Sequence, residues 1–176
     1  MTSIKKATFG GGCFWCIDAA FRRVRGVTSV RSGYTGGHTP EPTYKAICQG
    51  DSGHAEVVEV SFDSTMVNYD TLLAMFFTLH DPTQLNRQGN DIGTQYRSVI
   101  YYHDEYQHRT ISDTITNIQQ QISAPIVTEV SEAQTFYAAE DYHQDYFNEN
   151  PNQGYCSMLI APKIAKFEQR FVNNID

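Results

Sequence analysis

The chain has 176 residues, enough to bury one substantial core, and this length predicts a single domain over residues 1–176. Thirteen Lys and Arg against twenty Asp and Glu give a formal charge of -7, and no long basic run could follow a phosphate backbone. The first residues lack an apolar signal region, and no stretch approaches the roughly 18 apolar residues of a membrane span. We therefore expect a cytoplasmic protein that binds neither nucleic acid nor a membrane.

The first half of the chain predicts three strands and two helices. The glycines at positions 10 to 12 form a turn that connects the first strand to a helix, and this helix ends before Gly26. The Gly-, Pro- and Thr-rich stretch 35–53 indicates a long functional loop with one helical turn at 44–48. The predicted strands are 4–9, 27–34 and 54–62, and the predicted helices are 13–24 and 68–80, the second with Asn68 as N-cap.

The second half continues with a further loop at 83–96 and ends in a helix that Pro162 opens. Strands and helices follow one another without regular alternation. We therefore expect an α+β sandwich with helices packed on a mostly antiparallel sheet. The predicted elements are strands at 97–102 and 126–130 and helical segments at 104–122, 140–148 and 162–172, with a loop around 151–156.

Two of the four cysteines, Cys13 and Cys16, follow three glycines at the predicted start of the first helix. In a chain of this size without a secretion signal, thiols that react or bind metal are expected more often than structural disulfides. The free amides and the dipole of a helix N-terminus stabilise a thiolate. We therefore interpret Cys13 as the attacking sulfur and Cys16, on the same side of the helix, as a thiol that could capture an oxidised Cys13.

Other interpretations of this cysteine pair stay open at this point. A zinc site needs a second pair of ligands, but Cys48 and Cys156 are far apart in the sequence, and the six histidines show no metal-like spacing. The pair could also be inert and buried, or belong to a dithiol-exchange module or to a domain that binds methionine-rich partners. A phosphate-binding glycine loop lacks its Lys-Ser or Lys-Thr. We expect neither a metal nor another cofactor.

Three further residues suit a site around this nucleophile. Phe14 and Trp15, the only tryptophan, lie between the two cysteines, and aromatic rings pack well against sulfur and its methyl groups, although they could equally belong to the core. Glu56 shares one face of a predicted strand with Val58. Burial there would raise the pKa of Glu56 and keep it protonated, whereas a solvated carboxylate at a strand end is the alternative.

Five short segments complete the pattern: GCFWC at 12–16, PTY at 42–44, GHAEVVEV at 53–60, QGNDIGTQYRS at 88–98 and GYC at 154–156. Together and in this order, they resemble the A-class peptide methionine sulfoxide reductases over nearly the whole chain. The resemblance implies thiol-dependent reduction of methionine S-sulfoxide, free or in proteins, and so the repair of oxidised proteins. It also implies a two-layer fold of the ferredoxin-like, or plait, type, with thioredoxin as the usual electron donor.

The same resemblance suggests roles for residues besides the two cysteines. A sulfoxide oxygen leaves only when it is protonated, so the site needs acid groups near it. Tyr44 and Tyr96 match the family tyrosines that hydrogen-bond this oxygen. Phe14 and Trp15 match the pocket for the sulfoxide methyl group, and Asp91 matches an aspartate that helps to bind and orient the substrate.

The implied cycle begins when Cys13 attacks the substrate sulfur while Glu56 and the tyrosines supply protons, and it leaves Cys13 as a sulfenic acid. A second thiol condenses with it, and thioredoxin reopens the disulfide. Cys156, in a glycine-flanked loop expected to be flexible, matches a family recycling cysteine. We expect Cys156 to react first with the sulfenic acid of Cys13. Cys16 stands where many family members carry Gly, and we expect it to act as a relay or as an alternative to Cys156. Cys48 is expected to be a packed thiol.

Overall fold

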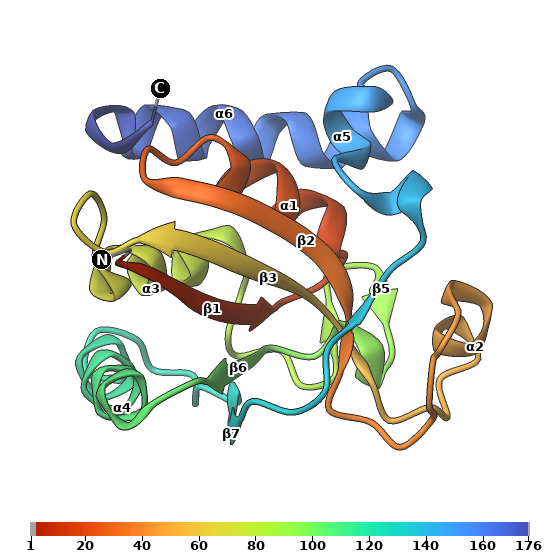
Figure 1. Cartoon of the computed structure of the whole chain (residues 1–176), viewed down its shortest axis with the longest axis horizontal. Coiled ribbons are helices and arrows are strands. Elements are labelled where there is room, and N and C mark those ends of the chain that lie inside the picture. Colours follow the sequence, from red (N-terminus) through yellow and green to blue (C-terminus); the bar gives the residue numbers. More distant parts are fainter. Residues whose placement is uncertain (1–2, 176) are drawn as a thin grey trace.

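The computed structural model describes residues 3–175, and Figure 1 shows a curved sheet with helices packed against it. The six-stranded sheet has the order β7-β6-β1-β3-β2-β8; β6 and β7 are parallel and the other neighbours are antiparallel. A separate hairpin joins β4 and β5. The strands are β1 (Ile4–Gly10), β2 (Val27–Thr35), β3 (Ala55–Asp63), β4 (Arg87–Gln88), β5 (Asp91–Ile92), β6 (Val99–Tyr102), β7 (Glu129–Glu132) and β8 (Tyr137–Ala138).

Side chains cap the start of the two long helices α3 (Tyr69–Leu79) and α4 (Glu105–Gln119). The Asn68 side chain accepts the amide of Thr71 at 2.8 Å, and Asp104 caps the next long helix by accepting the amide of Gln107 at 2.8 Å. The α-helices are α1 (Phe14–Arg22), α2 (Tyr44–Cys48), α3 (Tyr69–Leu79), α4 (Glu105–Gln119), α5 (Tyr146–Glu149) and α6 (Ala161–Arg170). Short 3-10 segments are η1 (Thr94–Tyr96), η2 (Asp141–His143) and η4 (Val172–Asn174), and η3 (Cys156–Ile160) is a π-helical segment.

The centre of the fold is a β-α-β-β-α-β unit. Its elements follow in the chain order β1, α1, β2, β3, α3 and β6, and its strands lie in the antiparallel order β6-β1-β3-β2. This arrangement is the ferredoxin-like plait. The predicted α+β fold, with a mixed and mostly antiparallel sheet, is therefore confirmed.

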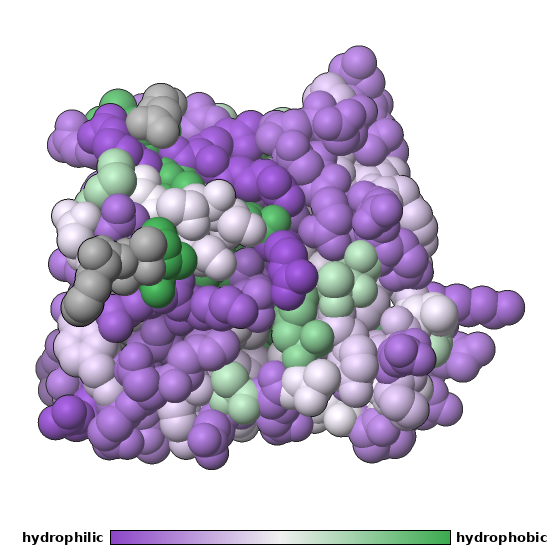
Figure 2. All heavy atoms as spheres, in the orientation of Figure 1, coloured by the Kyte–Doolittle hydropathy of each residue, from purple (hydrophilic) through white to green (hydrophobic). Residues whose placement is uncertain are grey.

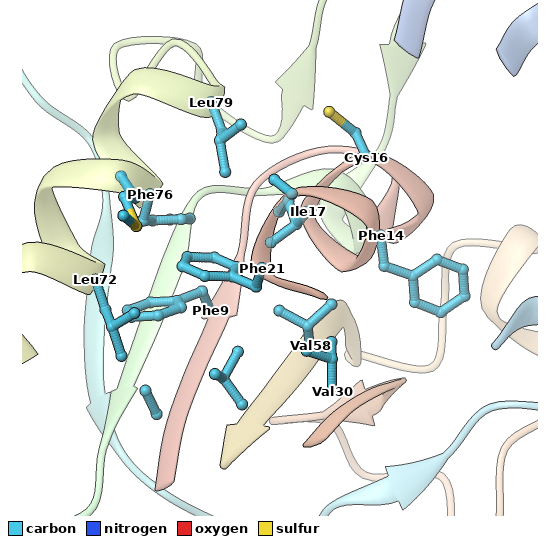
Figure 3. Close-up of a cluster of buried hydrophobic side chains, with 14 of the residues drawn as sticks. Phe9, Phe14, Cys16, Ile17, Phe21, Val30, Val58, Leu72, Phe76 and Leu79 are labelled. Atoms are coloured by element: carbon cyan, nitrogen blue, oxygen red, sulfur yellow. The ribbon is translucent and has the colours of Figure 1, made fainter. Parts of the chain in front are cut away.

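The main core lies between the sheet and the helices (Figure 3). Phe9 of β1 stacks against Phe21 of α1 and Phe76 of α3, with ring centroids 5.4 and 4.9 Å apart. Ile111 of α4 and Ile164 of α6 are buried in the same cluster, so the long helices cover one face of the sheet. This packing fixes β1 and α1 relative to each other, and with them the glycine turn that connects them.

Strand β3 is buried on both faces. Val58 belongs to the main core, whereas Val57 belongs to a second cluster with Val99 and Tyr101. The alternation along this strand therefore separates two packed faces, and it does not mark one face as solvated. A carboxyl group on either face of the middle of β3 is removed from water.

Several segments differ from the sequence prediction. The predicted loop 83–96 contains the β4–β5 hairpin and η1, and the predicted helical segment 140–148 is divided into η2 and α5. Strand β7 begins at Glu129, later than the predicted 126–130, because it pairs in parallel with β6 from the register position Val99 onward. Strand β8 has only two residues and no pattern of its own. The predicted loop around Cys156 is wrong at that residue, because η3 starts there and continues directly into α6.

The face of the molecule drawn in Figure 2 is mainly polar, with apolar residues in small scattered groups. Within residues 3–175, no helix combines the length and the apolar character needed to cross a membrane.

Candidate active site

Cys13 lies where the glycine turn meets α1. It is the N-cap residue of the helix, and its side chain is half-buried. The preceding Gly12 has a φ of +86°, in the left-handed region that favours glycine, and its amide donates to the carbonyl of Tyr96 at 3.1 Å. This hydrogen bond joins the glycine turn to η1, so it holds Cys13 and Tyr96 in fixed positions relative to each other.

Replacing Gly12 with alanine is expected to destabilise the protein. A Cβ at this position would lie 2.9 Å from side-chain carbons of Gln88, and the φ of +86° would be strained for any L side chain. We expect Gly12→Ala to lose about 1–3 kcal/mol in the free energy of unfolding, measured by urea denaturation. The matched control is Gly154→Ala, since a Cβ at Gly154 meets no described atom within 4 Å; equal losses in both variants would contradict the steric argument.

The thiol of Cys13 is neutral in the resting site. Burial raises its pKa well above the ordinary value, and the neighbouring Glu56 raises it further, although the amide of Trp15 acts in the opposite direction. The helix amide at Trp15 lowers the pKa of Cys13 in the expected direction, but burial and the charge of Glu56 outweigh it, so the net shift is upward. The cost of burying a charge outweighs the stabilisation that the helix amides provide.

Glu56 lies on β3 directly beside the start of α1. Its side chain is 1% exposed, and its Oε1 accepts the backbone amide of Phe14 at 3.2 Å. Its Oε2 is buried and has no hydrogen-bond partner within residues 3–175. Burial raises the pKa of Glu56 to about 8, against the opposing effect of the Phe14 amide. At neutral pH, Glu56 is therefore mostly a protonated acid with one oxygen left to act on a bound molecule.

Two tyrosine hydroxyls complete the acidic side of the site. Tyr44 is the first residue of α2, and Tyr96 is the last residue of η1. Burial raises the pKa of both phenols, and the charge of Glu56 raises both further, which places these groups within electrostatic reach of that carboxyl. Both hydroxyls keep their protons at neutral pH and can donate hydrogen bonds to an oxygen.

Phe14 and Trp15 have different environments. Phe14 is fully buried in the core, with its ring 5.7 Å from the ring of Tyr34. Trp15 is half-buried and stacks on Tyr146, with centroids 3.8 Å apart and planes 9° apart. The indole of Trp15 therefore forms an aromatic wall, while Phe14 packs in the core against Tyr34 and His143, and His143 also contacts the Trp15 ring.

Beside Cys13 opens a pocket of about 330 Å³. Its lining includes Cys13 and Cys16 at the start of α1 and Asp91 of β5. It also includes Tyr155, which directly precedes η3, and Lys163 of α6. The Tyr155 hydroxyl donates to Asp91 at 2.6 Å, and this bond links the hairpin to the segment that precedes η3. Within residues 3–175, no group of three or more His, Cys, Asp or Glu side chains could hold a metal ion.

The geometry thus gathers a thiol, a protonated carboxyl and two phenols around one helix start. The family model for peptide methionine sulfoxide reductase matches residues 5–175. The chain belongs to this family. The match extends over both halves of the fold, so it includes every element that contributes to the site.

Relatives of this reductase agree with the family match. The peptide methionine sulfoxide reductase MsrA of Acinetobacter baumannii (strain AYE) is 56% identical over 168 residues, covering 96% of each chain. The reduced Mxr1 from Saccharomyces cerevisiae has a TM-score of 0.81 at 33% identity, covering 88% of this chain and 90% of that one. Methionine sulfoxide reductase A of Corynebacterium diphtheriae has a TM-score of 0.78 at 36% identity, with 90% and 80% covered. A further structure shows Mxr1 in complex with Trx2.

The cysteines of this reductase differ in accessibility. All four are free thiols. Cys16 is 6% exposed and lines the pocket next to Cys13, and burial raises its pKa to about 11. Cys156 is fully buried in η3, so the expected flexible loop is not present around it. Cys48 is exposed at the end of α2, which contradicts its expected packed position, and its thiol lies beside the Tyr44 hydroxyl.

Two site residues of the reductase were missed by the sequence analysis. The indole Nε1 of Trp15 donates to Nδ1 of His143 at 3.0 Å, and the His143 ring lies 4.4 Å from that of Tyr44. Glu140 accepts the hydroxyl of Tyr34 at 3.1 Å and the amide of Tyr44 at 3.0 Å. The only available signal was that a buried indole N–H usually finds a partner, which does not say where that partner is in the sequence.

Proposed function

We propose that this reductase converts methionine S-sulfoxide, free or in proteins, to methionine through a sulfenic acid at Cys13, and so repairs oxidised proteins. The observation that carries this mechanism is the protonated Glu56. Its Oε1 is held by the amide of Phe14, one residue after the nucleophile, and its Oε2 is buried without a partner within residues 3–175. A sulfoxide oxygen beside Cys13 would satisfy that oxygen and receive a proton from it.

The chemical step moves one oxygen atom from the substrate sulfur to Cys13. The sulfur of Cys13 attacks the sulfoxide sulfur and forms an S–S bond with it. The oxygen then bonds to the sulfur of Cys13 while the S–O and S–S bonds to the substrate sulfur break, and methionine leaves. The product at Cys13 is a sulfenic acid, whose oxygen comes from the substrate and whose proton replaces the one that the thiol gave up. Glu56 donates a proton to the oxygen as charge develops on it, and the hydroxyls of Tyr44 and Tyr96 donate hydrogen bonds.

Substrate binding is assigned to the aromatic and hairpin sides of the site. The exposed part of the Trp15 ring suits the methyl group of the sulfoxide, and the buried Phe14 packs against the His143 ring that also contacts Trp15. Asp91 lines the pocket beside Cys13, and its bond to the Tyr155 hydroxyl fixes its orientation. Asp91 is therefore placed to orient a polar part of the substrate.

Cys16 is the better-placed thiol for resolving the sulfenic acid. Residues three apart on a helix have Cβ atoms about 5–6 Å apart, so a shift of about 1–2 Å at the Cys13 cap reaches the roughly 3.5–4.5 Å of a disulfide, and Cys13 and Cys16 line the same pocket. Cys156 is fully buried in η3 and would need part of that segment to unwind. We therefore place Cys16 first and Cys156 second, which reverses the order that the sequence motif favoured.

Thioredoxin is the reductant in this proposal, as the resemblance implies, and Mxr1, which this chain resembles at 33% identity, forms a complex with Trx2. The four free thiols suit a reducing compartment, so we propose the cytoplasm. Residues 1–176 act as one catalytic domain, since the site draws on elements from β1 to α6.

Disulfide mapping after one turnover tests this order of thiols. Reduced enzyme is mixed with one equivalent of an S-sulfoxide peptide, quenched at intervals with an alkylating agent, and digested for mass analysis. We expect the first disulfide of the wild type and of Cys156→Ser to join Cys13 and Cys16. Cys16→Ser should release methionine at the normal rate but accumulate sulfenic acid. A disulfide between Cys13 and Cys156 as the first wild-type product would overturn the proposed order.

A further inference from the structure

The pocket beside Cys13 holds a charge that the proposed cycle has not used. Figure 3 shows the sulfur of Cys16 pointing away from the Phe9 and Phe21 cluster, and Cys16 lines the pocket that also contains Cys13. Among the residues that line this pocket, Lys163 is the only cation. Two sulfurs and one ammonium group therefore share a single opening.

Lys163 comes from α6, which packs against α1. Its side chain is exposed, and within residues 3–175 it has no ion-pair partner, so its charge is not neutralised by a neighbouring carboxylate. Lys166, almost one turn further along α6, lines an adjoining cavity of about 410 Å³ but not the pocket of Cys16. The position of Lys163 beside the thiol is thus specific to that residue.

The other titratable groups around Cys16 do not supply a positive charge. Asp91 accepts the hydroxyl of Tyr155, and both residues line the pocket. At the end of α3, His80 is neutral at pH 7, because burial lowers its pKa to about 4. Cys13 rests as a thiol, since burial raises its pKa. Burial likewise raises the pKa of Cys16, and Lys163 is the group that acts in the opposite direction.

We propose that Lys163 is a positioning residue for the resolving step, in which its ammonium group stabilises the Cys16 thiolate that attacks the sulfenic acid of Cys13. In this step the S–S bond forms and the S–O bond of Cys13 breaks. The leaving hydroxide takes the proton that Cys16 gave up, and one water molecule is released. No outside oxidant is needed, because the sulfenic acid already carries the oxidising equivalents of the substrate. This inference rests on the proposed function, which supplies that intermediate.

The test separates the two chemical steps in single turnovers of the full-length reduced enzyme. Methionine release reports the first step, and the loss of alkylatable Cys16 reports the second. For Lys163→Gln we expect normal methionine release but about threefold to tenfold slower disulfide formation at pH 7, because a thiol with a higher pKa has less thiolate and only partly regains the rate through greater nucleophilicity. The pH profile of disulfide formation should move to higher pH, and Lys163→Arg should restore it.

Lys166→Gln is the matched control, since it removes the same charge from the same helix outside the pocket. We expect it to leave both steps and the pH profile unchanged. The inference is overturned if Lys163→Gln forms the disulfide with the wild-type rate and profile, if Lys166→Gln slows it equally, or if Arg at position 163 fails to restore it. A wild type that releases no methionine would instead refute the proposed function, so the two failures are distinguishable.

Discussion

Cys13→Ser is expected to abolish reduction of an S-sulfoxide peptide, with a loss of at least about 10⁴-fold, the order of effect of removing a catalytic nucleophile. A serine hydroxyl is far less acidic than a thiol, and a buried site makes its anion still harder to form. The fold should be unaffected, because Cys13 is the N-cap of α1 and serine is among the favoured N-cap residues.

The measurement follows conversion of the oxidised peptide by mass spectrometry, together with thermal unfolding of each variant. Cys48→Ser is the matched control, since it makes the same atomic change at an exposed thiol, and the serine hydroxyl can keep the contact with the Tyr44 hydroxyl. It should retain most of the activity. Turnover by Cys13→Ser within tenfold of the wild type would show that another group is the nucleophile.

Glu56→Gln is expected to slow methionine release by about 10² to 10⁴-fold, the usual contribution of a positioned general acid. Glutamine has the same shape and can still accept the amide of Phe14, so the start of α1 stays in place. It cannot transfer a proton to the sulfoxide oxygen. The matched control is Glu59→Gln on the same strand, where the carboxylate pairs with Arg31 and not with the site. If both variants keep the wild-type rate, Glu56 is not the proton donor.

The raised pKa of Glu56 predicts how activity and stability depend on pH. Methionine release by the wild type should fall as pH rises through about 8, where Glu56 loses its proton. Its pKa is raised from 4.5 in the unfolded chain, so between about pH 4.5 and 8 the folded state keeps a proton that the unfolded state releases. Stability therefore decreases as pH rises through this window. Glu56→Gln should remove this slope and gain about 1–3 kcal/mol at pH 7, measured by urea unfolding at several pH values.

The fold was largely predictable because its signals are local. Alternation along 54–62, the glycines before α1 and the Asn68 cap each lie within a few residues of the element that they define. The segment around Cys156 was misjudged because Gly154 indicates a break, yet the chain is already helical there and passes through a π-helical segment into α6. Strand β8 exists only through its pairing with β2, which no short window of sequence contains.

The site was predictable only as far as its chemistry is local or familiar. The sequence placed Cys13 at a helix start, and the structure agrees, but the pKa of its thiol depends on burial by distant segments. His143 is 128 positions from the Trp15 indole to which it bonds, and Glu140 reaches Tyr44 from 96 positions away. Neither residue has a motif of its own, so three-dimensional proximity was needed to find them.

Trp15 is the only tryptophan of the chain, and it is two positions from Cys13 and one from Cys16. It stacks on Tyr146 and is hydrogen-bonded to His143, in the wall assigned to the substrate methyl group. All tryptophan fluorescence of this protein therefore comes from its catalytic centre. Substrate binding and each change in the oxidation state of the neighbouring cysteines should alter the emission of this single intrinsic fluorophore, so both can be followed without an attached dye.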